Sequence, residues 1–461
     1  MLAPRARLLF WFAALAGPSS LLPVLSPEEA GWALVGPMAL AVLAAWDATL
    51  VLGTLKRSRV EAVTTTRCAQ GRASFVPLKM TAERARADRV ILSVALPAEL
   101  RSHEEAVMVP LPASREPLQV EWAFTPRSRG HFTAREARLC VASPLGFWTH
   151  WVQHAISAEI RCYPNLSEDR RKVAALFLNR GGLGMHTQRQ VGQGREFEKL
   201  REYLPGDGYD EIHWKATAKR GQPVTKVYQI ERTQEVYVMV DVSRLSARMV
   251  PAGTSPSIPA PEQKNETDEV AAEEPMLERC LSAALVLGQA AEHQGDLFGL
   301  TVFGERVEKF IRAGTGVGHF HACRDALYRL SSTDTSPDFE ELASFVRSRL
   351  RRRAMLLYLT SLDDPILAES FLRHAQLLSR QHLMIVFMIQ PNGVRPLFAD
   401  ESAESIDSIY EDLGGHLRWH SLREQKRQLQ QWGIPFHVVA PGTLAVDMIR
   451  RYAEAKNRQL L

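Results

Sequence analysis

Two long apolar runs open the chain, at residues 8–25 and 31–55. The first is broken by a glycine, two prolines and two serines, whereas the second contains a single acid, Asp47. A helix needs about 20 apolar residues to cross a bilayer, so the second run meets this length clearly and the first only marginally. The pattern predicts a membrane hairpin of two spans within residues 1–59.

Basic residues stand at the outer ends of this hairpin. Arg5 and Arg7 precede the first run, a basic cluster at 56–59 follows the second, and the connection contains two glutamates and no basic residue. Because basic flanks stay on the cytoplasmic side, both ends of the hairpin are expected in the cytoplasm. An alternative is a signal peptide cleaved near the Ala-Leu-Ala sequence at 14–16, which would leave the orientation of the second span unchanged.

Asp47 has two interpretations. It can be a functional acid within the membrane, because ionisable groups at that depth usually serve a site. The simpler interpretation, which we favour, places it in the cytoplasmic third of the bilayer, where it reaches water or a partner helix.

Short β-like runs replace the long apolar runs between residues 60 and 165. Proline, glycine and charged residues separate them at close intervals, and no helical period stands out. This pattern predicts a small antiparallel β-domain, arranged as a sandwich. The Pro-Gly turn at 143–147, with its apolar residues, is expected to be structural. Strands are predicted at 73–78, 89–96, 106–109, 118–124, 137–141 and 161–164.

Residues 166–235 form a polar connector. A helical patch at 173–178 is followed by five glycines between positions 181 and 194. A glycine-rich loop can hold phosphate, but no strand leads into this one and the G-x-x-x-x-G-K-[ST] pattern is absent from it. The glycines therefore indicate a hinge rather than a nucleotide site.

From residue 236 onward strands and helices alternate, which predicts a doubly wound α/β domain with a mostly parallel sheet. Its first strand, 236–240, is followed directly by Asp241. Residues 252–274 are rich in proline and glutamate without apolar periodicity, so a disordered insert is expected there. Further strands are predicted at 297–303, 307–311, 355–360, 383–389 and 436–439, and helices at 276–293, 320–330, 336–351, 365–379, 405–432 and 444–456.

Two of these helices have recognisable starts. Ser336 is the expected cap of the helix at 336–351, with Pro337 in its first turn. Asp364 is the expected cap of the helix at 365–379.

Composition adds little to this picture. A net charge of +4 over 461 residues gives no argument for nucleic-acid binding. The arginines between 347 and 353 share a helix with glutamates, which favours a solvated face or contact with anionic lipid headgroups. Five cysteines are scattered without C-x-x-C spacing, which indicates free thiols in a reducing compartment rather than disulfides or a metal centre.

A dense polar and aromatic segment lies between the glycines and Asp241. Mixed charges with tryptophan and tyrosine on a short segment are typical of a hydrogen-bonded brace between domains, or of an interaction surface. In a brace, Arg201 would pair with Asp207 or Glu196, and Trp214 would fill the seam. The candidate interaction residues are Arg201, Glu202, Tyr203, Asp207, His213, Trp214, Lys215 and Lys219.

An enzymatic alternative uses the same segment. His213 near Asp207, with Glu202 and Lys215, could act as a general base. No cysteine flanks a histidine in a recognisable motif, and the chain has no G-x-S-x-G sequence for a nucleophile. We therefore expect no catalytic residues and treat a hydrolase of envelope substrates as an alternative.

The block from Leu200 to Lys219 resembles the signature of a bacterial family known as domain of unknown function 58. It reads L-R-E-Y-L-P-G-D-G-Y-D-E-I-H-W-K-A-T-A-K here, against L-R-E-Y-x-P-G-D … I-x-W-K-A-x-A-(K/R) in the family. The resemblance covers nearly the whole chain. It implies a von Willebrand factor A-like fold over 236–461, a place in the bacterial inner membrane with the bulk of the chain in the cytoplasm, and association with MoxR-type AAA+ ATPases.

The resemblance also raises a metal site. A-like domains that hold Mg²⁺ or Mn²⁺ use an Asp-x-Ser-x-Ser loop, a distant Thr and a distant Asp as oxygen ligands. Asp241 and Ser243 match the start of this loop, the second serine is missing, and Thr315 and Asp363 are candidates for the distant ligands. Arg244 adds a cation beside the site. The degraded set favours a structural aspartate over an occupied metal site, so no cofactor is expected.

The sequence therefore predicts a membrane-anchored cytoplasmic adaptor or scaffold that works with a MoxR-type ATPase on client proteins. The chain carries no phosphate-binding loop of its own, which is typical of an adaptor rather than a motor. A divalent-metal-dependent ligand-binding module and an envelope-associated hydrolase are the alternatives. The expected partners are the ATPase, client proteins and, through the hairpin, membrane lipids, without nucleic acid.

Overall fold

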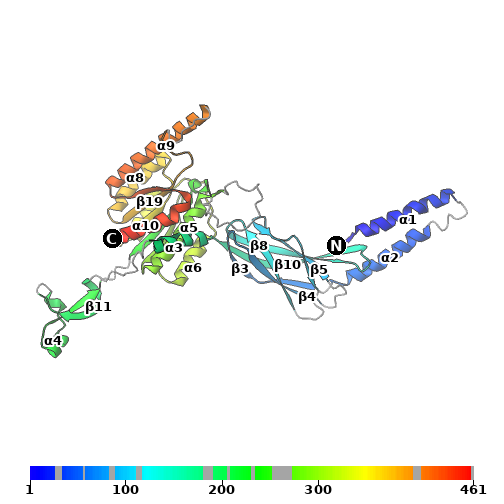
Figure 1. The fold of residues 1–461 in the computed structure, drawn as a ribbon, viewed down its shortest axis with the longest axis horizontal. Helices are drawn as coiled ribbons and strands as arrows, with labels where there is room; N and C mark the ends of the chain where they lie inside the picture. Colours follow the sequence, from blue (N-terminus) through cyan, green and yellow to red (C-terminus); the bar gives the residue numbers. More distant parts are fainter. Residues whose placement is uncertain are drawn as a thin grey trace. The chain divides into compact units, whose positions relative to one another are not determined.

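The computed structural model describes ten stretches of the chain. Contacts divide the chain after Asn165 into two compact units, Met1–Asn165 and Leu166–Leu461 (Figure 1). Most of the expected disordered insert at 252–274 and the glycines at 181–190 lie outside the described residues, as does Asp207 of the signature block. The described residues are 1–25, 34–55, 58–82, 89–110, 117–179, 191–204, 208–229, 234–251, 273–397 and 406–457.

The first unit begins with two helices that pack against each other, α1 (Ala6–Leu25) and α2 (Val35–Leu52). Among the described residues, α2 is the one helix long and apolar enough to cross a membrane, with a mean hydropathy of 1.8. The structure thus gives one candidate span where the sequence predicted two.

Two β-sheets form the rest of this unit. The first has the order β1-β10-β9-β5-β7, with β3 beside β10, and the second has the order β2-β4-β8-β6. All neighbours are antiparallel except β3 and β10, which confirms the predicted antiparallel β-region. The strands are β1 (Leu2–Pro4), β2 (Ser58–Ala62), β3 (Thr65–Ala69), β4 (Ser74–Ala82), β5 (Arg89–Ala95), β6 (Leu100–Ser102), β7 (Val107–Pro110), β8 (Leu118–Pro126), β9 (Gly130–Ala142) and β10 (Trp148–Tyr163).

One hydrophobic core serves both sheets and the end of α2. Alternate residues of β4 and β5 point inward, so that Leu78 and Leu92 are fully buried whereas the residues on either side of them are partly or fully exposed. Val51 of α2 and Leu55 just after it lie in the same core. The end of the apolar helix is therefore part of the β-domain.

Two parts of this sheet differ from the prediction. The last strand is predicted at 161–164, whereas β10 starts at Trp148, because its polar and aromatic first half does not alternate clearly. No strand is predicted before α1, where β1 pairs with residues 148–150.

A mixed six-stranded sheet organises the second unit, with the order β17-β16-β13-β18-β19-β20. All strands are parallel except β17, which runs antiparallel at one edge. This confirms the predicted mostly parallel α/β sheet. The strands are β13 (Glu235–Asp241), β16 (Leu297–Phe303), β17 (Val307–Gly314), β18 (Met355–Leu359), β19 (Leu383–Ile389) and β20 (Phe436–Val439).

Helices cover both faces of this sheet. The central strand β13 is therefore buried on both of its faces. Val238 and Val240 face α5 and α10, whereas Tyr237 and Met239 face α7 and α8. Helix α3, which the sequence analysis assigned to the connector, packs on α5 and α10 and belongs to this core. The helices are α3 (Ser167–Asn179), α5 (Met276–His293), α6 (Val317–Leu327), α7 (Phe339–Arg349), α8 (Pro365–Ser379), α9 (Ile406–Gln431) and α10 (Leu444–Asn457).

The start of α7 differs from the prediction. Its cap is Asp338, whose Oδ1 accepts hydrogen bonds from the backbone of Glu340 and Glu341 at 2.9 and 3.0 Å, and not Ser336. A carboxylate is the stronger cap because it also interacts with the helix dipole. The predicted cap of α8 is confirmed, since Asp364 accepts from the backbone of Ile366.

Candidate functional site

The signature block forms a small structure of its own. Strand β11 (Val191–Glu202) pairs antiparallel with β12 (Val224–Gln229). Between them lie a short 3-10 turn, η2 (Tyr209–Glu211), and the helix α4 (Trp214–Arg220). The helix ends at Gly221, whose φ of 71° is the left-handed conformation that glycine adopts without strain. The block is thus a hairpin that carries a helix in its connection.

His213 holds the start of α4. Its Nδ1 accepts a hydrogen bond from the backbone of Ala216 at 3.0 Å, and its own backbone N–H donates to the carbonyl of Val224 at 2.8 Å. Because Nδ1 is an acceptor here, the neutral ring carries its proton on Nε2. A ring used in this way caps a helix and does not offer a free base.

The block exposes large aromatic and apolar side chains. Tyr209 is 77% exposed, Trp214 68% and Leu204 57%, whereas Ile212 is buried. The ring of Tyr203 stacks on that of Tyr209 with 6.4 Å between centroids. We call Leu204, Tyr209 and Trp214 the aromatic surface. The role of Trp214 in a brace between domains stays a prediction.

The charged candidates of the block surround this surface. Lys215 and Lys219 are exposed on α4, and Glu202 is exposed at the end of β11. Arg201 donates from Nη1 to the carbonyl of Glu202 at 3.2 Å. Its predicted pairing with Asp207 or Glu196 involves side chains that lie outside the described part of the block.

Asp241 lies at the carboxyl end of β13, where it is buried. Its Oδ2 accepts from the Thr360 hydroxyl at 2.6 Å, and its Oδ1 accepts from the backbone N–H of Ser243 at 2.8 Å. Burial raises the pKa of this carboxyl, and the bonds from Thr360 and Ser243 oppose that rise. The Ser243 hydroxyl accepts in turn from the backbone of Leu245 at 3.4 Å. Asp241 and Ser243, the two predicted ligands, thus already accept hydrogen bonds from other groups of the protein.

Asp363 lies at the same edge of the sheet, in the loop after β18. Its Oδ2 accepts from Arg248 at 2.5 Å, and its Oδ1 accepts from the Ser361 hydroxyl at 2.7 Å. Arg244 lies 3.9 Å from the next carboxylate, Asp364. Arginines therefore occupy the space around these carboxylates.

Thr315 does not join this group. Strand β17 is antiparallel, and Gly314 at its end pairs with Phe298 near the start of β16, whereas Asp241 pairs with Phe303 at the end of β16. That separation corresponds to about 17 Å along a strand. The sequence pattern identified the strand but not its direction, so Thr315 is removed from the candidate ligands.

Thr333, and not Thr315, is the threonine that lies beside the loop after Asp241. Its backbone N–H and its hydroxyl both donate to the carbonyl of Val242, at 2.7 and 3.0 Å. The Thr-Asp-Thr sequence at 333–335, between two predicted helices, was the signal available in the sequence.

The residues present do not fit a divalent ion. Within the described ranges no group of three or more histidine, cysteine, aspartate or glutamate side chains could hold a metal. The two oxygens of Asp241 already accept hydrogen bonds, and arginine pairs with Asp363. A divalent cation at this site would be repelled by the two guanidinium groups that already supply positive charge there.

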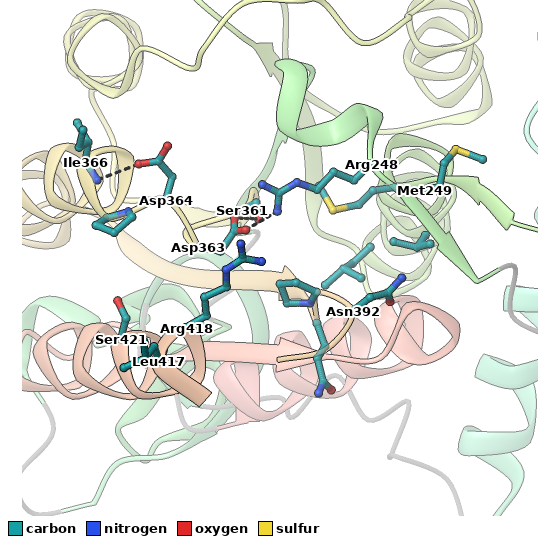
Figure 2. Close-up of a pocket in the computed structure, with 16 residues that line it drawn as sticks. Arg248, Met249, Ser361, Asp363, Asp364, Ile366, Asn392, Leu417, Arg418 and Ser421 are labelled. Atoms are coloured by element: carbon teal, nitrogen blue, oxygen red, sulfur yellow. Dashed lines mark hydrogen bonds and ion pairs between the residues drawn. The ribbon is translucent and has the colours of Figure 1, made fainter. Parts of the chain in front are cut away.

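A cavity of about 820 Å³ opens at this edge of the sheet. Figure 2 shows Arg418 pointing from α9 into it, toward Asp363. No described residue forms a hydrogen bond or ion pair with Arg418. Leu417 and Ile366 add exposed apolar area beside it. Sequence reasoning missed Arg248 and Arg418, because they come from a loop and a helix that only the fold brings together.

A family profile described as "Protein of unknown function DUF58" matches residues 199–250 and 266–395. Over residues 199–395 the chain belongs to the DUF58 family. The DUF58 match covers the whole signature block from Leu200 to Lys219 and the strands of the sheet as far as β19. It includes Arg248 and Asp363 of the cavity but not Arg418. The five cysteines are free and buried.

Comparison with curated proteins gives no significant match. Among solved structures, an aerotolerance-related membrane protein from Bacteroides fragilis aligns at 13% identity over 48% of this chain and 98% of that one, with a TM-score of 0.28. An uncharacterized membrane spanning protein from Vibrio fischeri aligns at 13% over 48% and 98%, with a TM-score of 0.18. Proximal thread matrix protein 1 from the mussel byssus aligns at 8% over 48% and 46%, with a TM-score of 0.24.

Proposed function

We propose that this DUF58 protein is an adaptor or scaffold of the bacterial inner membrane that works with a MoxR-type AAA+ ATPase on client proteins. The hairpin holds it in the membrane with both ends in the cytoplasm, and the bulk of the chain lies there. The observation that carries the proposal is the aromatic surface of Leu204, Tyr209 and Trp214, which lies exposed within the signature block. Exposed aromatic side chains are enriched at protein interfaces.

The frame of the block supports this role. The helix α4 begins at a histidine cap and ends at a glycine with positive φ, so its backbone is fixed while its outer side chains remain free. Ile212 and Val224 are buried under it. A rigid aromatic group loses little conformational entropy on binding, which favours its use as an anchor.

The second unit offers a separate surface for a client. We propose that it is a von Willebrand factor A-like domain, preceded by a β-sandwich. In open α/β sheets, ligands bind beyond the carboxyl ends of the strands, and the cavity with Arg418 lies there. A guanidinium group without a partner among the described residues suits an acidic side chain of a client.

The two alternatives have less support. A metal-dependent module would need free oxygen ligands, but the carboxylates of Asp241 and Asp363 already accept hydrogen bonds from neighbouring groups. A hydrolase would need a free base, whereas Nδ1 of His213 accepts from the backbone of Ala216. We therefore assign no catalytic residue.

The test is recovery of the ATPase with a tagged full-length chain from detergent-solubilised native membranes, read by mass spectrometry. Trp214→Ala is expected to reduce recovery at least about tenfold, because an aromatic anchor at an interface contributes about 2 kcal/mol or more. Tyr410→Ala is the matched control, since Tyr410 on α9 is also 68% exposed. It should leave recovery unchanged.

A chelator separates the alternatives. The adaptor proposal expects the same recovery with and without it, whereas loss only with chelator would support the metal-dependent module. Absence of any MoxR-type ATPase in both conditions would contradict the proposal. The hydrolase alternative would then be tested by turnover of envelope substrates that His213→Ala removes.

A further inference from the structure

The turn between β9 and β10 is held by an acid of the apolar helix. Asp47 of α2 is fully buried, and its Oδ1 and Oδ2 accept from the backbone N–H groups of Leu145 and Phe147 at 3.1 and 3.3 Å. The indole of Trp148 donates to the carbonyl of Ala44 at 2.8 Å. The turn and this part of α2 therefore form one rigid body.

The start of α1 is fixed to the same turn. The backbone N–H of Arg5 donates to the carbonyl of Phe147 at 2.8 Å, and the amino terminus donates to the carbonyl of Trp151 at 2.8 Å. Strand β1 pairs with the beginning of β10. Both helices thus leave the β-domain at one end, where Figure 1 marks the amino terminus.

An open hollow lies between the first turns of α1 and this turn. Its volume is about 430 Å³, and its lining is Ala6, Arg7, Phe10, Trp11, Leu145 and Phe147. Phe10 is 67% exposed and Leu145 41%. The hollow therefore combines an apolar wall with one cation.

That cation is available for a ligand. The guanidinium group of Arg7 lies over Gly146, where an added Cβ would be 3.2 Å from its Nη1. No carboxylate of the described residues lies within ion-pair distance of it. Gly146 has a φ of 75°, so the turn both requires a glycine and leaves room for the arginine.

The position of Asp47 along α2 determines the level of the hollow relative to the membrane. The part of α2 before this residue, Val35–Trp46, extends about 18 Å at 1.5 Å per residue. The hydrocarbon core of a bilayer is about 30 Å thick. Because this part of α2 is shorter than the hydrocarbon core, inserting α2 into the membrane brings the turn at 143–147 at least as far as the headgroups.

We propose that this hollow binds an anionic phospholipid. The phosphate pairs with Arg7, the acyl chain lies along Phe10 and Leu145, and Trp11 lies at the interface between headgroups and hydrocarbon, where indole rings concentrate. A free phosphate ion would leave the apolar wall exposed, whereas a lipid covers it. The inference rests on the membrane attachment proposed above.

The first experiment places an environment-sensitive fluorophore on the full-length protein at Leu145→Cys. The native cysteines are all buried, so the new thiol is the one that reacts. In vesicles of phosphatidylcholine mixed with phosphatidylglycerol, its emission is expected to shift to the blue. Phe75→Cys is the matched control, because Phe75 is 49% exposed at the end of β4 that lies away from Ser58 and the helices. Equal emission at the two positions would overturn the proposal.

The second experiment tests the charge. Arg7→Gln, in the Leu145→Cys background, is expected to raise the phosphatidylglycerol content needed for half of the shift about fivefold, the effect of one basic residue near an anionic surface. Arg101→Gln on β6 is the control and should change nothing. An unchanged titration in Arg7→Gln, or reversal of the shift by inorganic phosphate, would overturn the lipid assignment.

Flotation with the vesicles separates two failures. A chain that floats without a shift at position 145 retains its membrane attachment and loses only the lipid site. A chain that does not float overturns both.

Discussion

The carboxylate of Asp241 accepts a hydrogen bond at each of its oxygens, from Thr360 and from the backbone of Ser243. It is buried, and no basic side chain of the described residues is hydrogen-bonded to it. Removing a carboxylate from water disfavours its charged form, so burial raises its pKa. The residue that looked like a metal ligand in the sequence therefore serves to close the loop after β13.

This environment gives a stability that depends on pH. Because the folded pKa of Asp241 lies above the unfolded value of about 3.9, the folded protein holds the proton more tightly. The protonated carboxyl of Asp241 contributes fully to the free energy of unfolding below the unfolded pKa. This contribution is lost as the pH rises through the folded pKa.

Asp241→Asn is expected to remove this pH dependence, because an amide keeps an acceptor for Ser243 and does not ionise. At pH 7 the variant should be more stable than the wild type, because the amide avoids the cost of a buried charge. Thermal unfolding of both proteins over a pH series, with Mg²⁺ and with chelator, is the measurement. Mg²⁺ should not change the wild-type midpoint. A Mg²⁺-dependent rise that the variant lacks would restore the metal site.

Helix α9 carries Arg418 at the cavity, and its backbone packs closely against the backbone of the loop after β19. The helix contains adjacent glycines, and a Cβ at Gly415 would clash with the carbonyl oxygen of Gly393 in the loop after β19. A Cβ at Gly414 would meet nothing within 4 Å. Only one of the two glycines is therefore required by packing.

The pair makes a matched test at the level of the element. Gly414→Ala should stabilise the protein by up to about 1 kcal/mol, because alanine favours helix over glycine. Gly415→Ala should destabilise it by about 1–3 kcal/mol, because the obstacle is backbone and cannot rotate away. Thermal unfolding of the two variants compares them directly. Equal shifts of the same sign would contradict the proposed close approach.

At the scale of the whole molecule, both ends of the helical pair attach to the same β-domain. Strand β1 pairs with β10 just before α1, and α2 ends in the hydrophobic core that contains Val51. A chain that leaves one domain and returns to it brings both attachments to one side of any membrane that the helices enter.

Fusions of a reporter to each end of the full chain test this topology. A fluorescent protein that folds only in the cytoplasm should be bright at both ends, and a periplasmic phosphatase should be inactive at both. Opposite results at the two ends would contradict a returning hairpin. Loss of the amino-terminal fusion from the mature protein would instead support the cleaved signal peptide.

The sequence by itself determined the features that depend on local pattern. Period-two runs marked β4, β5 and β8, buried apolar runs marked β13, β18 and β19, and Asp364 marked the start of α8. The signature from Leu200 to Lys219 identified the family. Each of these features depends on residues that are close together in the sequence, because strand alternation, helix capping and family motifs are local properties.

Tertiary structure decided what depends on residues far apart in the chain. The antiparallel direction of β17 excluded Thr315, and the turn after β9 gave Asp47 its partners, although nearly 100 residues separate them. The pairing of Arg248 with Asp363 also depends on residues far apart in the chain, as does the close contact between Gly415 of α9 and the loop after β19. A side chain's role depends on which polar and charged groups reach it in space, and no period along the sequence encodes that.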